Sequence, residues 1–210
     1  MSSSSPVSHR PPAQGLYAPE FERDACGVGF VAHARGRASH ELVRMGLDAL
    51  KRMDHRGATG AEANTGDGAG ILVGLPHDFL ARRCAAIGLT LPPPGHYAVG
   101  VLFASPRPES RDQGRALFER VVREEGLTLL GWRQPIVDSS GLGSSARAVE
   151  PTILHALIGR GRENLGEDSP EAEEAFERRL FVVRKRFETL IAATPQPNPE
   201  GGDDRAFFYL

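Results

Sequence analysis

The sequence predicts one globular domain that mixes α-helices with β-strands and follows a leader without regular structure. The composition is 40% hydrophobic and 25% charged, which is typical of a soluble globular protein. A length of 210 residues fits one large domain, or one domain with extensions. Segments with apolar residues at helical spacing alternate along the chain with short strand-like runs, which indicates a mixed fold.

The first part of the chain predicts a disordered leader and then a strand. Residues 1 to about 20 are dominated by Ser, Pro and Gly, which bury little apolar surface. The opening stretch "MSSSSPVSHRPPAQG" lacks the apolar middle region of a secretory signal. In "GVGFVAHA", Val28, Phe30 and Ala32 alternate with smaller or polar residues, so we expect a short strand over 27–34.

The clearest helix pattern covers 39–57. Ser39 is placed to cap its start, basic residues favour its C-terminal end, and Gly57 is placed to stop it. Its apolar stripe consists of Val43, Leu47, Leu50 and Met53. The stretch 65–76, "TGDGAGILVGLP", then predicts a glycine-rich turn that leads into a strand ended by Pro76.

The rest of the chain predicts three more helices and several strands. One helix is expected over 78–89, and it carries Cys84. A second is expected over 109–127, with Leu117, Val121 and Val122 on one face. A third is expected over 169–193, with Ser169 as cap and Pro170 in the first turn. Strands are expected over 96–104, over 127–137 with Pro135 ending it, and over 151–160, where brevity favours a strand over a helix. Loops are expected over 139–151 and 194–204.

The C-terminal residues 205–210, "RAFFYL", begin another strand pattern. A strand needs neighbours, and this pattern begins at the very end of the chain. We therefore expect the 210 residues to be a fragment of a longer protein.

Charge and cysteine content exclude several classes of function. With 25 basic and 27 acidic residues the net charge is -2, which gives no electrostatic footprint for nucleic acid or for an anionic membrane. No apolar run reaches the ~18 residues of a membrane span. The two cysteines, Cys26 and Cys84, form neither a disulfide framework nor a zinc-type cluster, so a cytoplasmic setting is expected.

Cys26 has two possible interpretations. It can be a small buried hydrophobe at the edge of a strand, which is the usual place of a free cysteine. It can also be a nucleophile, because Gly27 and Gly29 leave the backbone open to a ligand and the leader ends just before it. A cysteine at a mature N-terminus could use its own α-amine, with a pKa near that of a thiol, as the base. That arrangement requires removal of residues 1–25.

The stretch 53–70, "MDHRGATGAEANTGDGAG", is the second candidate for chemistry. The simplest interpretation is a helix end followed by a tight turn, with His55 and Arg56 in solvent. "GDGAG" lacks the Lys-Ser/Thr pair of a phosphate-binding loop and precedes a strand, so we discount a phosphate site. A loop whose glycines let the backbone approach another loop fits better.

Four segments together resemble a known family. "RDACGVGFVAH", "LDALKRMDHRGATGAEANTGDGAGILVGLP", "LGWRQPIVDSSGLGSSARAVEP" and "EEAFERRLFVVRKRFE" occur in the order found in the N-terminal glutamine amidotransferase domain of glutamate synthase large subunits. The resemblance runs from about Tyr17 to the C-terminus. It implies an α+β fold of the N-terminal nucleophile type, a four-layer αββα sandwich that is incomplete in this chain. It also implies a propeptide, residues 1–25, cut from a domain that spans 26–210.

The resemblance also implies roles for single residues. Cys26 would attack the side-chain amide of L-glutamine, its α-amine would carry the proton, and ammonia would leave behind a glutamyl thioester. Arg56 aligns with the arginine of the family's His-Arg-Gly motif and would support the site. His55 would be structural, although a Cys-His pair is the alternative. The family's segments for the substrate α-carboxylate and for the oxyanion hole are expected beyond Leu210, so we expect the fragment alone to be inactive.

The function implied is the glutaminase portion of a glutamate synthase large subunit, whose ammonia aminates 2-oxoglutarate elsewhere in the protein. No cofactor is expected in this chain; the family's FMN and iron–sulfur (3Fe-4S) cluster would lie outside it. Expected partners are the remainder of the large subunit and the NADPH-dependent small subunit. Two alternatives stay open: a truncated, non-catalytic binding or regulatory module of the same fold, and a related hydrolase with an amide substrate other than glutamine.

Overall fold

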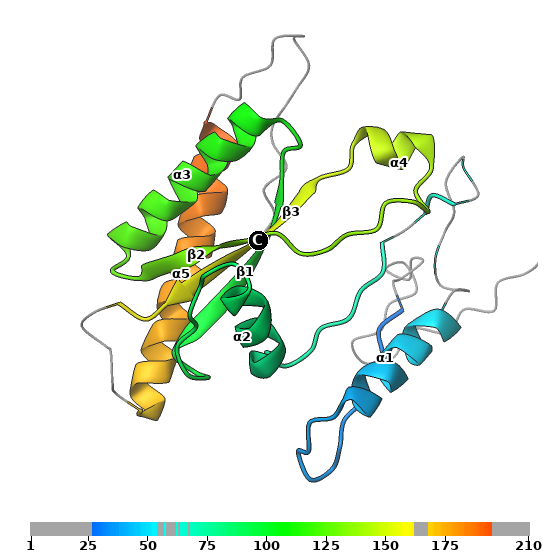
Figure 1. Cartoon of the computed structure of the whole chain (residues 1–210), viewed down its shortest axis with the longest axis horizontal. Coiled ribbons are helices and arrows are strands. Elements are labelled where there is room, and N and C mark those ends of the chain that lie inside the picture. The colour runs from blue at the N-terminus through cyan, green and yellow to red at the C-terminus, as the bar shows by residue number, and fades with distance from the viewer. Residues whose placement is uncertain are drawn as a thin grey trace, which may run out of the picture. The chain divides into compact units, whose positions relative to one another are not determined.

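Figure 1 presents the chain as a computed structural model that describes residues 27–53, 57, 62, 64–66, 68–161 and 168–194. The chain forms two compact units, Met1–Val73 and Gly74–Leu210. The leader expected over 1–20, the loop expected over 194–204 except Thr194, and the strand expected over 205–210 lie outside the described residues. None of the described helices combines the length and apolar character that crossing a bilayer requires.

The first unit contains helix α1 (His40–Arg52). The Ser39 side chain accepts a hydrogen bond from the Leu42 N–H at 3.3 Å, which confirms the predicted cap. The predicted stop at Gly57 is wrong, because the helix already ends at Arg52. There the Met53 N–H bonds to the Leu50 carbonyl at 3.0 Å, and this tighter bond closes the last turn.

Two strands predicted in the first unit are absent from its described residues. The segment 27–34 contains no strand, and Val28 and Phe30 are 92% and 94% exposed. The described residues of 65–76 likewise contain no strand, and Leu72 is fully exposed. A strand exists only when another backbone pairs with it, and the apolar alternation in these segments does not specify a partner.

The second unit is built on a three-stranded antiparallel sheet. Its strands are β1 (Tyr97–Ala104), β2 (Thr128–Arg133) and β3 (Thr152–Gly159), and they lie in the order β1-β3-β2. All three strands predicted in this region are confirmed, including the choice of a strand over a helix for β3. A bulge interrupts β2 between Leu129 and Gly131.

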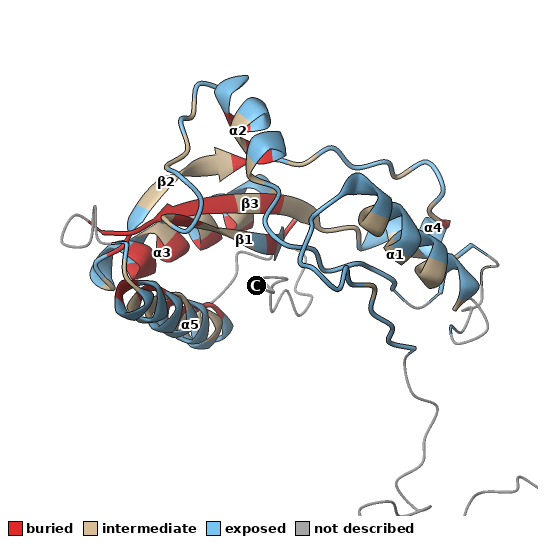
Figure 2. Ribbon diagram, turned by 90° about the horizontal axis from the view of Figure 1, so that it is seen from below, coloured by how far each residue is buried: buried red, intermediate tan, exposed pale blue. Residues whose placement is uncertain are grey.

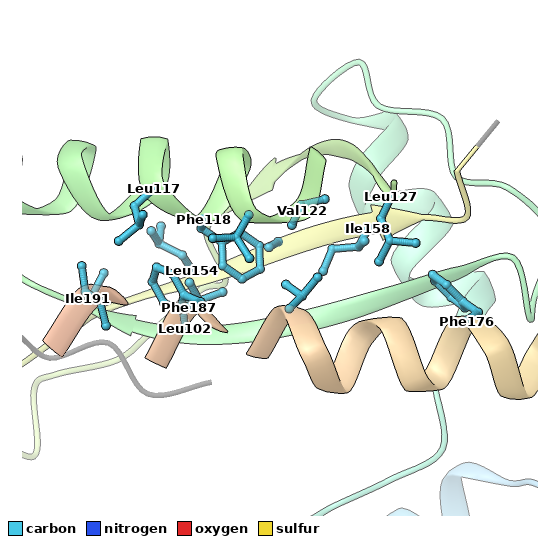
Figure 3. Packing of buried hydrophobic residues seen from close by; sticks show 14 residues of the cluster. Leu102, Leu117, Phe118, Val122, Leu127, Leu154, Ile158, Phe176, Phe187 and Ile191 are labelled. Atoms are coloured by element: carbon cyan, nitrogen blue, oxygen red, sulfur yellow. The ribbon is translucent and has the colours of Figure 1, made fainter. Parts of the chain in front are cut away.

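Helices α3 (Pro108–Glu124) and α5 (Pro170–Ala193) cover one face of this sheet (Figure 2). Both were predicted, and the Ser169 side chain caps α5 by accepting from the Ala172 N–H at 3.1 Å. The rings of Phe118 and Phe187 meet edge to face with centroids 5.1 Å apart. The core between helices and sheet (Figure 3) consists of Leu102, Ala104, Leu117, Phe118, Val121, Val122, Leu127, Leu154, Ala156, Ile158, Phe176, Val183, Phe187 and Ile191.

Two ion pairs and a close backbone contact hold neighbouring elements against the C-terminal end of α3. Arg186 of α5 pairs with Glu124 at 2.6 Å and also with Glu125, which ties α5 to the C-terminal end of α3. After β3, the chain passes so close to the end of α3 that a Cβ on Gly161 would lie 1.8 Å from the Gly126 carbonyl oxygen. Only glycine fits at position 161 without moving backbone.

Helix α2 (His77–Ala85) lies on the opposite face of the sheet, and it buries Leu80 and Cys84 (Figure 2). The prediction that Cys84 sits on a helix is confirmed. The segment 139–151, predicted as a loop, contains the short helix α4 (Ser144–Ala148). The run of small residues there permits one helical turn, and Arg147 stabilises it through a bond from its guanidinium to the Ser139 carbonyl at 3.1 Å.

Candidate functional site

Both predicted site residues, Cys26 and Arg56, lie outside the described residues, and so does His55. The structure therefore does not describe their contacts. What it does describe are the segments beside them. Residues 27–30 are exposed, and residues 27–39 form no helix or strand. Helix α1 ends at Arg52, shortly before Arg56.

The glycine-rich loop is described only in part. Thr65 makes a local turn: its hydroxyl donates to the Glu62 carboxylate at 2.9 Å and its N–H to the Glu62 carbonyl at 3.1 Å. A Cβ placed on Gly68 or Gly70 would meet nothing within 4 Å in the described structure. The described residues thus contain a tight turn, and they give no support to the predicted close approach of another loop.

Cys84, the second cysteine, is a structural residue. It belongs to α2, its side chain is completely buried, and it forms no disulfide. Burial raises the pKa of the Cys84 thiol, and the nearby charge of Arg133 offsets only part of that rise. A thiol that is both shielded from solvent and held protonated is a poor nucleophile. Cys84 is therefore not a candidate nucleophile.

A polar cluster on the α2 side of the sheet was not predicted from the sequence. It consists of two hydrogen-bonded pairs: His77 with the Tyr97 hydroxyl at 3.0 Å, and Arg133 with His155 at 3.0 Å. Arg133 is only 8% exposed, and its guanidinium lies 6.0 Å from the centre of the Phe79 ring. Arg133 and His155 lie opposite each other because of the register between β2 and β3, which the sequence pattern alone does not specify.

The Arg133–His155 bond determines the state of the imidazole. A guanidinium can only donate, so the Nδ1 atom of His155 must accept and the ring proton lies on Nε2. Burial lowers the pKa of His155, and the positive charge of Arg133 lowers it further. Burial, and to a smaller extent the proximity of Cys84, raises the pKa of Tyr97. His155 and Tyr97 are thus held neutral, which suits a packed interface and not acid–base catalysis near neutral pH.

His155 should make the second unit less stable in mild acid. The unfolded chain protonates His155 near pH ~6.5, whereas the folded chain does so only at lower pH, so folding stability falls as pH drops below that value. In His155→Asn, a side-chain oxygen can still accept from Arg133 but does not titrate. Urea midpoints at pH 7.5 and 5.5, read from Trp132 fluorescence, should therefore differ less in this variant than in the unmodified chain. His40→Asn, in the first unit, is the matched control, and equal pH dependence in all three proteins would contradict the role of His155.

The described residues contain no catalytic centre in the surface depression beside α4 and no cluster of side chains that could bind a metal ion. A shallow depression of about 420 Å³ beside α4 is lined by Leu142, Ser144, Arg147 and Ala148. Its one charged group, Arg147, already donates to the Ser139 and Leu142 carbonyls of its own loop. Among the described residues, no group of His, Cys, Asp and Glu side chains is arranged to hold a metal ion.

Comparison with known proteins identifies the family of the chain. The family model described as "Glutamine amidotransferases class-II" matches residues 26–201. The chain is 41% identical over 181 residues to the glutamate synthase (NADH) of Schizosaccharomyces pombe, an alignment that covers 86% of this chain and 8% of the relative. It is 39% identical over 181 residues to the glutamate synthase (NADPH) large chain of Bacillus subtilis, with 85% and 11% covered.

A third relative, ferredoxin-dependent glutamate synthase 2 of Synechocystis, is 40% identical over 165 residues, which is 78% of this chain and 10% of the relative. The chain thus spans about a tenth of the length of these relatives. The predicted resemblance to the amidotransferase domain of glutamate synthases is confirmed, as is a mixed fold with a small antiparallel sheet. The chain belongs to the class-II glutamine amidotransferases.

Proposed function

We propose that this chain is the glutaminase portion of a glutamate synthase large subunit, with Cys26 as its nucleophile. The observation that carries the proposal is where the family match starts: it begins at Cys26 itself and continues to residue 201. The structural role of Cys84 adds support, because it leaves Cys26 as the cysteine available for chemistry. Residues 1–25 are then a propeptide, and the amidotransferase domain starts at position 26.

The reaction runs in two steps. Removal of residues 1–25 frees the α-amine of Cys26, whose pKa of ~8 suits proton exchange with a thiol. The sulfur attacks the side-chain amide carbon of glutamine, the amine passes the thiol proton to the leaving nitrogen, and ammonia departs. Water then attacks the thioester and releases glutamate, so that one difficult amide hydrolysis is divided into two easier steps. Hydrogen-bond donors must stabilise the oxyanion formed at each attack.

Arg56 is proposed to position water or the active-site loops, as a supporting residue. It lies in the segment that follows α1, between the end of that helix at Arg52 and Gly57. The Ser39 cap fixes where α1 begins. His55 has a structural role in this proposal, since the α-amine of Cys26 supplies the base that a Cys-His pair would otherwise provide.

The finer architecture is proposed to be the four-layer αββα sandwich. The support comes from the second unit, where a layer of two helices, α3 and α5, packs on one face of an antiparallel sheet. A four-layer sandwich contains helix layers packed on sheets in this way.

In the whole protein, the ammonia would aminate 2-oxoglutarate at a separate synthase site, in the cytoplasm. FMN and an iron–sulfur cluster supply the redox chemistry of that site, and this chain does not fit the cluster, because two cysteines cannot provide its thiolate ligands. The relatives are named for NADH, NADPH and ferredoxin, so the electron donor differs among them. An NADPH-dependent small subunit is the proposed partner.

The proposal is tested by expressing the chain together with any coding sequence that follows Leu210. Intact mass should show an N-terminus at Cys26, and the protein should hydrolyse glutamine to glutamate and ammonia but leave asparagine intact. An uncut leader in a folded protein would overturn the propeptide. A correct cut with hydrolysis of a different amide would favour a related hydrolase, and a folded protein that hydrolyses none would favour a non-catalytic module.

A further inference from the structure

The outer edge of β1 carries backbone groups that no described strand pairs with. Within the described sheet, the only neighbour of β1 is β3. The Arg160 N–H donates to the His96 carbonyl at 3.1 Å, so His96 and Arg160 form a hydrogen-bonded pair at the start of the β1–β3 ladder. Since such pairs alternate along antiparallel strands, the N–H and C=O groups that point away from β3 belong to Tyr97, Val99, Val101 and Phe103. This edge is a ready template for one more strand.

The topology of the second unit indicates where a further strand belongs. From β1 onward the chain order is β1-α3-β2-α4-β3-α5, where the short helix α4 lies in the connection between β2 and β3, and the sheet order is β1-β3-β2. This sequence of elements is a split βαβ motif, β-α-β-β-α-β, that lacks its last strand among the described residues. Helix α3 carries the chain from β1 past β3 to β2, so β1 and β2 run parallel to each other with β3 antiparallel between them.

The handedness of crossovers selects the edge of β1 for that strand. Both α3 and α5 contribute to the same core, against the same strand residues, so both lie on one face of the sheet (Figure 2). Connections between parallel strands are almost always right-handed. The α3 connection starts from β1 and steps across the sheet toward β2. Because β3 runs antiparallel to β1, a connection of the same hand that starts from β3 and crosses the same face must step the other way, toward β1. A right-handed connection through α5 would therefore lead from β3 past β1 to the outer edge of β1.

The other edge of the sheet is a poorer site. To reach β2, a strand after α5 would have to step in the same direction as the α3 crossover, which gives the connection the disfavoured left hand. The bulge between Leu129 and Gly131 also interrupts the regular spacing of backbone groups along β2. In β1 the register runs without a shift from Tyr97 to Ala104.

We propose that the outer edge of β1 is a strand-addition site and that its occupant is the chain's own segment 206–210, antiparallel to β1. This segment, "AFFYL", is rich in the aromatic residues that strands favour. Helix α5 ends at Ala193, and Ile191 lies at the same end of the core as Leu102 and Leu117 (Figure 3). The linker 195–205 can span at most about 3.3 Å per residue, which is ample for the ~10 Å step between a helix layer and a sheet.

The test is amide hydrogen exchange of the full 210-residue chain, measured by NMR. The outer-edge amides of Val99, Val101 and Phe103 should be protected, as the inner amides of Gly100 and Leu102 are by β3. Phe208→Pro, which removes a donor from the added strand, should speed exchange of the outer amides by about tenfold or more and leave the inner ones slow. Glu200→Pro, in the linker, is the control and should leave both sets protected.

A second readout does not depend on any variant. In the unmodified chain, antiparallel pairing requires nuclear Overhauser contacts between α-protons of β1 and α-protons of 206–210. Fast exchange of the Val101 amide in the unmodified chain would overturn the proposal, as would contacts of 206–210 with β2. Because neither readout involves catalysis, a failure here is distinguishable from a failure of the proposed glutaminase reaction.

Discussion

Cys26→Ala is expected to lower glutamine hydrolysis by several orders of magnitude. Removing a covalent nucleophile abolishes the thioester route, and what remains is only the contribution of binding and oxyanion stabilisation. Binding of glutamine should persist, since alanine removes a single atom from the site. The measurement is glutamate release by the protein expressed with any coding sequence that follows Leu210, alongside trapping of the thiol with an electrophilic ketone analogue of glutamine.

Cys84→Ala is the matched control for that experiment, because it removes the same atom from the other cysteine. The Cys84 side chain is fully buried and its pKa is raised, so this variant should keep its activity and lose only some stability. Mass spectrometry of the labelled protein should place the adduct on the peptide that begins at Cys26. Activity that survives Cys26→Ala, or a label on Cys84, would contradict the assignment.

The sequence predicts elements well where each element finds its partner inside its own unit. Strands β1, β2 and β3 pair with one another, and their apolar patterns coincide with the residues that meet α3 and α5. The patterns at Val28–Phe30 and Ile71–Val73 are as apolar, yet these side chains are exposed. Alternation specifies which side chains favour burial, whereas pairing depends on a second backbone that the pattern does not identify.

The candidate site was predicted by a different kind of signal. Cys26 and Arg56 were chosen because of the motifs around them, and the family match that starts at Cys26 agrees with that choice of family. Spacing along the chain could not predict the Arg133–His155 pair, which depends on the register of two strands separated by a loop and a short helix. A motif identifies chemistry, but the neighbours that tune it are set by tertiary structure.

Phe118→Ala is expected to destabilise the second unit by about 3–5 kcal/mol, the usual cost of deleting a buried aromatic ring. Phe118 is completely buried and lies at the centre of the core, with its ring 5.1 Å from that of Phe187 and 5.6 Å from that of Trp132. It therefore joins α3, α5 and β2, and the cavity left by alanine would weaken all three contacts. The loss is comparable with the whole stability of a small domain.

Trp132 makes this prediction measurable without separating the units. It is the only tryptophan of the chain and packs against the core of the second unit, so its fluorescence follows unfolding of that unit alone. With a slope of about 2 kcal/mol/M, the urea midpoint should fall by roughly 2 M. Phe181→Ala provides the matched control, because Phe181 lies on α5 with 62% of its surface exposed. This variant should change the free energy of unfolding by less than about 0.5 kcal/mol. If the two variants unfolded at the same urea midpoint, the assignment of the core to this helix–sheet interface would be wrong. Removing a phenylalanine ring would then destabilise the unit equally at a buried position and at an exposed one.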